Sequence, residues 1–250
     1  MTGARAVHVE HVWGTVVSLS VPLHRVDGAA ARRGIDAVVR WLHQVDEVFS
    51  TYRAGSEVSQ LRDGRLEEVA VSHDLADVLA RCRHVSRLTH GRFDPWSVPG
   101  GFDPSGLVKG WAADRAAEIL ADHGAIDCMI AAGGDVTVRG EPEPGRVWTV
   151  GLQHPELPGQ IHGTVDATDC AVATSGLYER GEHIIAAGAV AAISATVVGP
   201  DGATADGLAT ALLIEGVPGL AWVSRLAGYS AQVVQGSTVT SQGPAFVTTD

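Results

Sequence analysis

Cysteine is scarce in this sequence, which has only Cys82, Cys128 and Cys170 among its 250 residues. Their number is odd and they are far apart in the chain, which excludes a disulfide framework and a zinc site built from clustered cysteines. Free cysteines behave as small hydrophobic residues and are commonly buried. We therefore expect all three to pack in the core.

Basic residues are also few. The 18 lysines and arginines face 29 aspartates and glutamates, so the net charge is -11 and the isoelectric point is near 5.4. This balance argues against a surface that binds nucleic acid or an anionic membrane. Any phosphate-bearing ligand must then be held by local donors against a repulsive overall field, which hints at a bound metal ion.

Long hydrophobic runs are missing as well. No stretch is long enough to span a bilayer, and residues 1–10 lack the charged start and apolar run of a signal peptide. We therefore expect a cytoplasmic protein without membrane insertion. What the chain does have is a hydrophobic share of 45%, enough for a sizeable core in one large domain or two small ones.

The hydrophobic pattern alternates between strand and helix periods along the chain, without an internal repeat or a low-complexity linker. Such alternation is typical of a mixed α/β fold. Strands are predicted over residues 7–12, 15–22, 125–132, 136–139, 147–152, 170–174, 191–198, 229–234 and 238–241. Helices are predicted over residues 28–50, 74–88, 205–214 and 218–226 and from Leu107 onward.

The stretch 102–114 (FDPSGLVKGWAAD) is the first candidate site. It begins as an Asp-Pro turn and continues as a helix, in whose first turn we expect Lys109. Unpaired N–H groups at a helix N-terminus already favour an anion, so a lysine placed there suggests that a phosphate docks against it. A solvated surface lysine is the alternative.

The second candidate site is the helix that carries Asp206 and Thr210. The two residues are four positions apart, so they share one helix face and both present oxygen, which suits Mg²⁺. The structural alternative is that Asp206 caps the helix and Thr210 bonds back to a carbonyl.

The third candidate site is the strand end at Thr174 and Ser175, followed by His183. The strand end offers hydroxyl and N–H groups, and His183 could accept a proton near neutral pH, although a structural histidine is equally consistent. In the loop 49–59, Tyr52 could stack on a ring and Ser56 could cap a turn; a turn without a ligand fits equally well.

Taken in order, these motifs resemble one family, the flavin transferases called ApbE. The resemblance runs from Trp13-Gly14-Thr15 to about Gly228. Its motifs are Phe49-Ser-Thr-Tyr-Arg with Ser56-Glu-x-Ser, Gly91-x-Phe-Asp-Pro, Asp103-x-x-Gly-x-x-Lys-Gly-x-Ala-x-Asp114, Gly133-Gly-Asp, Ala173-Thr-Ser-Gly-x-Tyr-x-Arg180, His183-Ile-Ile and Ala205-Asp-x-Leu-Ala-Thr-Ala.

The resemblance implies a single domain over residues 1–250, of mixed α+β class, with a mixed sheet flanked by helices. It implies transfer of FMN from FAD to a threonine or serine of an acceptor protein, with Mg²⁺ as cofactor and AMP as product. The FAD site would lie between the segments 91–114, 170–185 and 204–214.

The resemblance also implies residue roles. Gly106, Asp206 and Thr210 would hold the metal, and the catalytic residues would be His183, Lys109 and Asp206. The residues that would bind FAD are Tyr52, Ser56, Asp103, Ser105, Lys109, Thr174, Ser175, His183 and Ile184.

Departures from the family pattern keep other activities open. The segment Asp-Pro-x-Thr-Gly that usually follows His-Ile-Ile is replaced by Ala186-Ala187-Gly188, Trp13 stands where methionine is usual, and Arg62 stands where asparagine is usual. A FAD-binding protein that has lost transfer, or a FAD pyrophosphatase that releases FMN and AMP, is therefore the alternative. The sequence does not identify the acceptor protein or the oligomeric state.

Overall fold

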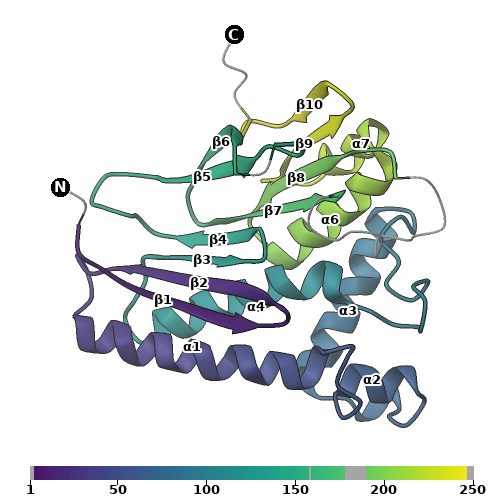
Figure 1. Cartoon of the computed structure of the whole chain (residues 1–250), viewed down its shortest axis with the longest axis horizontal. Helices are drawn as coiled ribbons and strands as arrows, with labels where there is room; N and C mark the ends of the chain where they lie inside the picture. The colour runs from purple at the N-terminus through teal and green to yellow at the C-terminus, as the bar shows by residue number, and fades with distance from the viewer. Residues whose placement is uncertain (1–2, 158, 178–189, 247–250) are drawn as a thin grey trace.

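An eight-stranded sheet forms the centre of the protein in a computed structural model, which describes residues 3–157, 159–177 and 190–246 (Figure 1). The strand order is β1-β2-β3-β4-β7-β8-β9-β10. The bounds are β1 Arg5–Val12, β2 Thr15–Pro22, β3 Cys128–Ala132, β4 Asp135–Arg139, β7 Cys170–Gly176, β8 Ser194–Gly199, β9 Ser230–Gln235 and β10 Thr238–Gln242. The mixed α+β class is confirmed.

The expectation of a mixed sheet is wrong for the described part of the chain, because all its strand pairings are antiparallel. That expectation rested on the family resemblance. In the structure β3–β4 and β9–β10 are joined directly, whereas helices lie between β2 and β3 and between β8 and β9 along the chain. The pair β1–β2 is also a direct hairpin. Its turn residues, Trp13 and Gly14, have φ of 60° and 70°, the left-handed values that tight hairpin turns require.

Three helices cover one face of this sheet: α1 (Gly28–Phe49), α4 (Ser105–Asp122) and α6 (Gly202–Glu215). Their apolar sides pack on inward-facing strand residues such as Leu19, Ile130 and Val197, all fully buried. Outside them lie α2 (Glu57–Arg62), α3 (His73–Leu88) and α7 (Leu220–Val223), with short 3₁₀ turns at Glu68–Ala70 and Val217–Gly219. The predicted helices and their starting points are confirmed to within a few residues.

The opposite face carries a second, two-stranded sheet of β5 (Trp148–Gln153) and β6 (Ile161–Ala167). Trp148, Val150 and Leu152 pack there on Val172 and Val198 of the main sheet. Helices therefore flank one face of the main sheet, and the small sheet covers the other. Strand β6 was missed because its exposed positions alternate irregularly around Gly163, so its period is weak.

No helix in the described residues is both long enough and apolar enough to cross a membrane.

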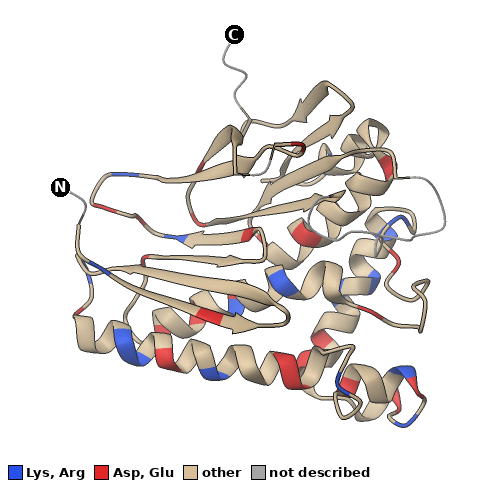
Figure 2. Ribbon diagram, in the orientation of Figure 1, with Lys and Arg blue, Asp and Glu red and all other residues tan. Residues whose placement is uncertain are grey.

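The cysteines are free, with Cys82 and Cys128 buried as expected and Cys170 partly buried. Burial raises the pKa of the Cys128 thiol to about 12. Acidic and basic residues are interspersed along the helices (Figure 2).

Candidate functional site

The site forms where helices α4 and α6 cross beside the ends of β4 and β7. Four segments that are far apart in the sequence supply one buried polar cluster, which consists of Gly106 and Lys109 on α4, Asp135 at the start of β4, Ser175 on β7, and Asp206 and Thr210 on α6. Two of the predicted site segments, 102–114 and 204–214, are thus brought together, and the strand end at 174–175 joins them.

Lys109 lies between two carboxylates. Its Nζ forms an ion pair with Asp135 Oδ2 and lies 3.6 Å from Asp206 Oδ2, and only 17% of its side chain is exposed. The alternative of a solvated surface lysine is therefore wrong. The helix begins at Ser105, so Lys109 lies just beyond the first turn. Its charge balances buried acids, and it remains close enough to the helix N-terminus to reach an anion there.

Asp206 is almost completely buried, with 1% of the residue exposed. Its Oδ2 accepts a hydrogen bond from the backbone N–H of Gly110 at 3.4 Å, but its Oδ1 has no hydrogen-bond partner among the described residues. The helix is capped by Asp201, which corrects the alternative that Asp206 is the cap. An orphaned carboxylate oxygen is costly unless something binds it, which is expected of a metal ligand.

Thr210 and Gly106 place two more oxygens next to this carboxylate. The Thr210 hydroxyl lies 3.5 Å from the Gly106 carbonyl oxygen and 3.3 Å from the Ser175 hydroxyl. An added Cβ on Gly106 would lie 3.1 Å from Thr210 Oγ1, closer than ordinary van der Waals contact, so glycine favours this close approach. The three predicted metal-binding residues therefore meet in one place.

This donor set fits Mg²⁺. No group of three or more histidines, cysteines or acidic residues arranged for a metal occurs in the parts of the chain that the structure describes. Mg²⁺ does not need one, because it commonly uses one or two carboxylates with waters and substrate phosphates. Asp206 Oδ1, the Thr210 hydroxyl and the Gly106 carbonyl are hard oxygen donors of this kind.

Asp103, Ser105 and Thr174 have structural contacts at the edge of the cluster. Asp103 Oδ1 accepts a hydrogen bond from the Ser105 N–H at 2.9 Å and so shapes the start of α4. The Thr174 N–H donates to Asp135 Oδ1 at 3.1 Å, and its hydroxyl pairs with that of Thr196 at 3.0 Å. All three predicted FAD-binding residues lie beside the metal-binding set.

Tyr52 and Ser56 belong to a separate loop. Tyr52 is 93% exposed and lines a hollow of about 360 Å³ together with Arg62 and Gly100, which are joined by a 2.7 Å hydrogen bond from Arg62 Nε to the Gly100 carbonyl. Ser56 is buried and caps α2 by accepting from the Ser59 N–H. Its hydroxyl also donates to the Ser50 carbonyl, so both of its hydrogen-bonding functions are in use.

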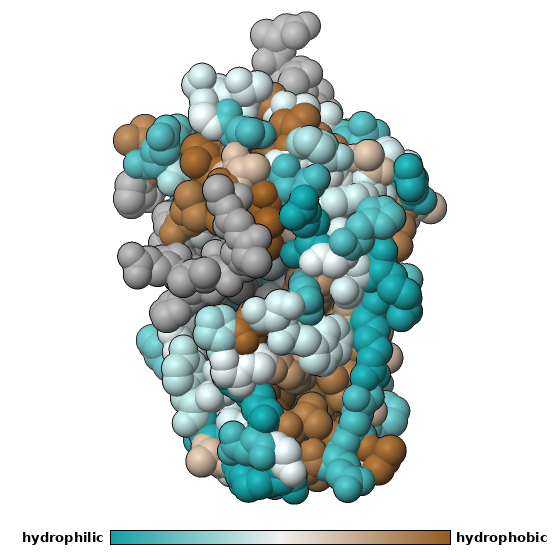
Figure 3. Space-filling view, turned by 90° about the vertical axis from the view of Figure 1, so that its right-hand side faces the viewer, coloured by the Kyte–Doolittle hydropathy of each residue, from teal (hydrophilic) through white to brown (hydrophobic). Residues whose placement is uncertain are grey.

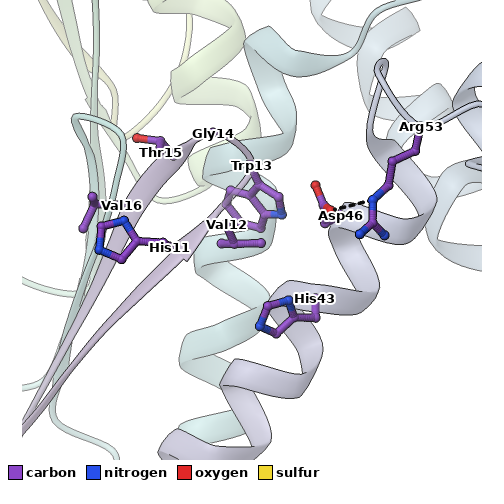
Figure 4. Close-up of a pocket in the computed structure, with 9 residues that line it drawn as sticks. All are labelled: His11, Val12, Trp13, Gly14, Thr15, Val16, His43, Asp46 and Arg53. Carbon is purple, nitrogen blue, oxygen red and sulfur yellow. Dashed lines mark ion pairs between the residues drawn. The ribbon is translucent and has the colours of Figure 1, made fainter.

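A larger hollow, of about 460 Å³, lies between the β1–β2 turn and the end of α1 (Figure 4). Trp13 turns its indole N–H toward the Leu42 carbonyl at 3.1 Å, and Asp46 pairs with Arg53 at 3.2 Å. None of the cluster's residues lines this hollow. The chemistry therefore points to the buried cluster, and hollow size alone does not locate the site.

On the face that forms the right-hand side of Figure 1, hydrophilic and hydrophobic residues are interspersed, with hydrophobic residues in both the upper and the lower part of the view (Figure 3). His183 and Ile184, predicted as base and FAD-binding residue, lie outside the described residues.

Sequence reasoning did not assign a role to Asp135, although the motif Gly133-Gly134-Asp135 was noted. In the structure both of its oxygens are engaged, Oδ2 by Lys109 and Oδ1 by the Thr174 N–H. Gly133 has a φ of 54°, and a Cβ there would lie 3.1 Å from Thr15 Oγ1 and 3.5 Å from Lys109 Cδ. The available sequence signal for Asp135 was an acidic residue at the start of a strand that directly follows two glycines.

The model of the ApbE family matches this chain over residues 13–100 and 97–233. Among curated proteins, the FAD:protein FMN transferase of Vibrio cholerae is 26% identical over 239 residues, covering 71% of this chain and 72% of the relative. The FAD:protein FMN transferase of Haemophilus influenzae is 24% identical over 250 residues, covering 70% of each.

Solved structures show the same fold. The ApbE protein of Thermotoga maritima superimposes with a TM-score of 0.81 at 23% identity, covering 95% of this chain and 96% of that one. The flavin transferase ApbE of Vibrio cholerae has a TM-score of 0.79 at 21% identity, covering 96% of each chain. At these identities the likeness establishes the fold alone.

Proposed function

The chain belongs to the ApbE family, and on that premise we propose that it is a FAD:protein FMN transferase. It takes FAD and an acceptor protein as substrates, moves FMN onto a threonine or serine hydroxyl through a phosphoester bond, and releases AMP. The family model and the names of the curated relatives support the transferase activity. The buried polar cluster supports the metal dependence.

Asp206, Thr210 and Gly106 would hold Mg²⁺. When bound, the ion would neutralise charge on the pyrophosphate of FAD. The observation that carries this assignment is the buried Asp206 Oδ1, which has no partner in the described residues and lies on the helix that presents Thr210. A bound cation would explain why this carboxylate oxygen is buried without a hydrogen-bond partner in the described residues.

Lys109 would supply a second positive charge. Its ammonium is held by Asp135 beside Asp206, where it can contact a phosphate oxygen of FAD at the start of α4. Phosphoryl transfer depends mainly on positioning and charge neutralisation, so a rigidly held lysine is suited to it.

The transfer step forms one phosphoester bond and breaks one phosphoanhydride bond. The acceptor hydroxyl oxygen attacks the phosphorus on the FMN side of the pyrophosphate and forms the new phosphoester bond. The bond from that phosphorus to the bridging oxygen breaks, and the bridging oxygen leaves with AMP. His183, in the family's His-Ile-Ile motif, would accept the hydroxyl proton.

The test mixes purified protein, FAD, Mg²⁺ and an acceptor domain that carries an Asp-x-x-Ser/Thr-Gly-Ala-Thr segment. We expect in-gel flavin fluorescence and an FMN-sized mass gain on the denatured acceptor, both lost with a chelator. Rapid AMP release without acceptor would instead indicate a pyrophosphatase. Tight FAD binding without either product, with several acceptors, would indicate a carrier.

A further inference from the structure

Helices α4 and α6 run antiparallel in a regular register that leads away from the metal-binding residues. Gly106 meets Thr210, Gly110 meets Asp206, and Asp114 meets Gly202. Each step of one turn forward along α4 is thus a step of one turn backward along α6. The last of these contacts involves Asp114, which has no role in the proposed chemistry.

The backbones of the two helices touch at Gly110 and Gly202. A Cβ on Gly110 would overlap the Gly202 carbonyl, and a Cβ on Gly202 would lie 2.7 Å from the Gly110 oxygen. Contacts between glycines have no interlocking side chains, so they allow close approach without themselves resisting sliding. A side-chain contact at this end of the helix pair would therefore help to fix where α6 lies along α4.

The side chain of Asp114 lies where it can fix the position of α6 along α4. Its Oδ2 accepts a 2.6 Å hydrogen bond from the N–H of Gly202, the first residue of α6. Its Oδ1 accepts from the Thr137 hydroxyl at 3.0 Å and from Arg139 Nη2 at 2.9 Å, both on β4. One carboxylate therefore joins α4, α6 and β4. The helical period of the apolar residues from Leu107 onward predicts that Asp114 lies on the polar face of this helix, away from the core, which the structure corrects.

The same strand β4 begins with Asp135, the partner of Lys109. Asp114 thus connects the three elements that supply Lys109, Asp135 and Asp206. Burial raises the pKa of Asp114, against the opposing effects of the Gly202 N–H and Arg139. Keeping a carboxyl group in so desolvated a place costs free energy, which is expected where geometry must be maintained.

We infer that Asp114 is a positioning residue that sets the register of α6 against α4 and thereby the spacing of the Gly106, Asp206 and Thr210 oxygens around the metal. This inference rests on the proposed function, in which those oxygens bind Mg²⁺. The carboxylate acts from about 12 Å along α4, at 1.5 Å of rise per residue from Gly106. Its removal lets α6 shift along the smooth glycine contact.

The experiment measures Mn²⁺ binding to the metal-free protein by isothermal titration calorimetry, without FAD or acceptor. The variants are Asp114→Ala, Asp114→Asn, which retains an acceptor for Gly202, and the control Asp201→Ala. Asp201 caps the same helix, through the Thr204 N–H at 2.7 Å, and pairs with Arg81 of α3; in the described structure no hydrogen bond or ion pair of its side chain reaches α4. Thermal unfolding of each variant is recorded alongside.

We expect Asp114→Ala to weaken Mn²⁺ binding about tenfold, the usual size for loss of a group that orients metal ligands. Asp114→Asn should have a smaller effect, and Asp201→Ala should bind as the wild type does despite a comparable loss in Tm. In the transfer assay, the Mg²⁺ concentration at half-saturation should rise for Asp114→Ala, while kcat at saturating Mg²⁺ changes much less.

Mn²⁺ affinity that is unchanged in both Asp114 variants, with a wild type that binds, overturns this inference and leaves the proposed function standing. Equal weakening by Asp201→Ala also overturns it, because the effect would then follow helix stability alone. A wild type that does not bind Mn²⁺ overturns the metal site itself and this inference with it. If Asp114→Ala does not fold, Asp114→Asn decides between these outcomes.

Discussion

At the scale of single residues, the cluster contains more buried acid than its lysine can neutralise. Asp135 and Asp206 are each at most 3% exposed in their side chains, and Lys109 lies close to both. Asp135 is fully hydrogen-bonded, whereas Asp206 keeps one orphaned oxygen in the described structure. The two acids therefore differ in their roles: Asp135 holds the lysine, whereas Asp206 is the carboxylate that we propose binds the metal ion.

Replacing Asp206 by alanine should abolish metal binding. The variant loses the orphaned oxygen together with its charge, so Mn²⁺ affinity should fall by at least about 100-fold. Mg²⁺-dependent AMP release should fall in parallel, measured by chromatography of the products. Asp122→Asn, at the exposed end of α4, is the matched control and should behave as the wild type. Metal-dependent AMP release that survives in Asp206→Ala would refute the metal assignment.

Replacing Lys109 by methionine should destabilise the fold, because two buried carboxylates then lose their cation. Breaking such a pair costs about 3 kcal/mol in the free energy of unfolding, measured by urea denaturation. The double variant Lys109→Met, Asp135→Asn should recover more than half of that loss, since one uncompensated charge is gone. If the double variant lost as much stability as Lys109→Met and the single variant Asp135→Asn lose together, the ion pair would contribute little.

At the scale of elements, the N-terminus of α6 is held by two carboxylates from different segments, its own cap Asp201 and Asp114 of α4. Burial pushes the pKa of Asp201 upward, but hydrogen bonds from Thr204 and the guanidinium of Arg81 outweigh it and lower the pKa below its ordinary value of 3.8. The charged form is thus favoured by folding, and the cap is strongest when ionised.

The lowered pKa of Asp201 predicts how the stabilisation by this N-cap depends on pH. A lowered pKa contributes stability that is complete above the ordinary value of 3.8 and is lost as pH falls through the lower, folded value. Asp201→Ala should therefore have a Tm about 2–4 °C below the wild type at pH 7. The gap should narrow below pH 3.8 in thermal melts followed by circular dichroism. A gap that is constant with pH would contradict the electrostatic part of the argument.

At the scale of the whole molecule, the sheet separates the site from a second layer. The helices and the polar cluster lie on one face, while the β5–β6 sheet packs on the other around Trp148, Val150 and Leu152. The β5–β6 layer therefore adds buried apolar packing from the face opposite the site.

Leu152→Ala tests this separation. The side chain is 3% exposed, so its truncation should cost about 2–5 kcal/mol in the free energy of unfolding, measured by urea denaturation. Mn²⁺ affinity of the folded protein should stay within about twofold of the wild type, because no contact of Leu152 reaches the helical face. A large loss of affinity at temperatures where the variant is folded would show that the two layers are coupled.

The sequence by itself determined much of the local structure and was enough to predict which residues would bind a metal. Turn residues, capping residues and hydrophobic periods are short-range signals, so α1, α3, α4 and the β1–β2 hairpin were predicted within a few residues. The spacing of Asp206 and Thr210 on one helix face was equally readable, because it depends on the helix period alone.

Only the tertiary structure decided which residues share a site and which are structural. The antiparallel sheet, the strand β6 and the pairing of Lys109 with Asp135 all depend on contacts between segments far apart in the chain, and no local pattern encodes them. The same holds for Asp114, whose period placed it on an outward helix face. Its carboxylate joins α4, α6 and β4 because those three elements converge in space, and convergence is a property of packing.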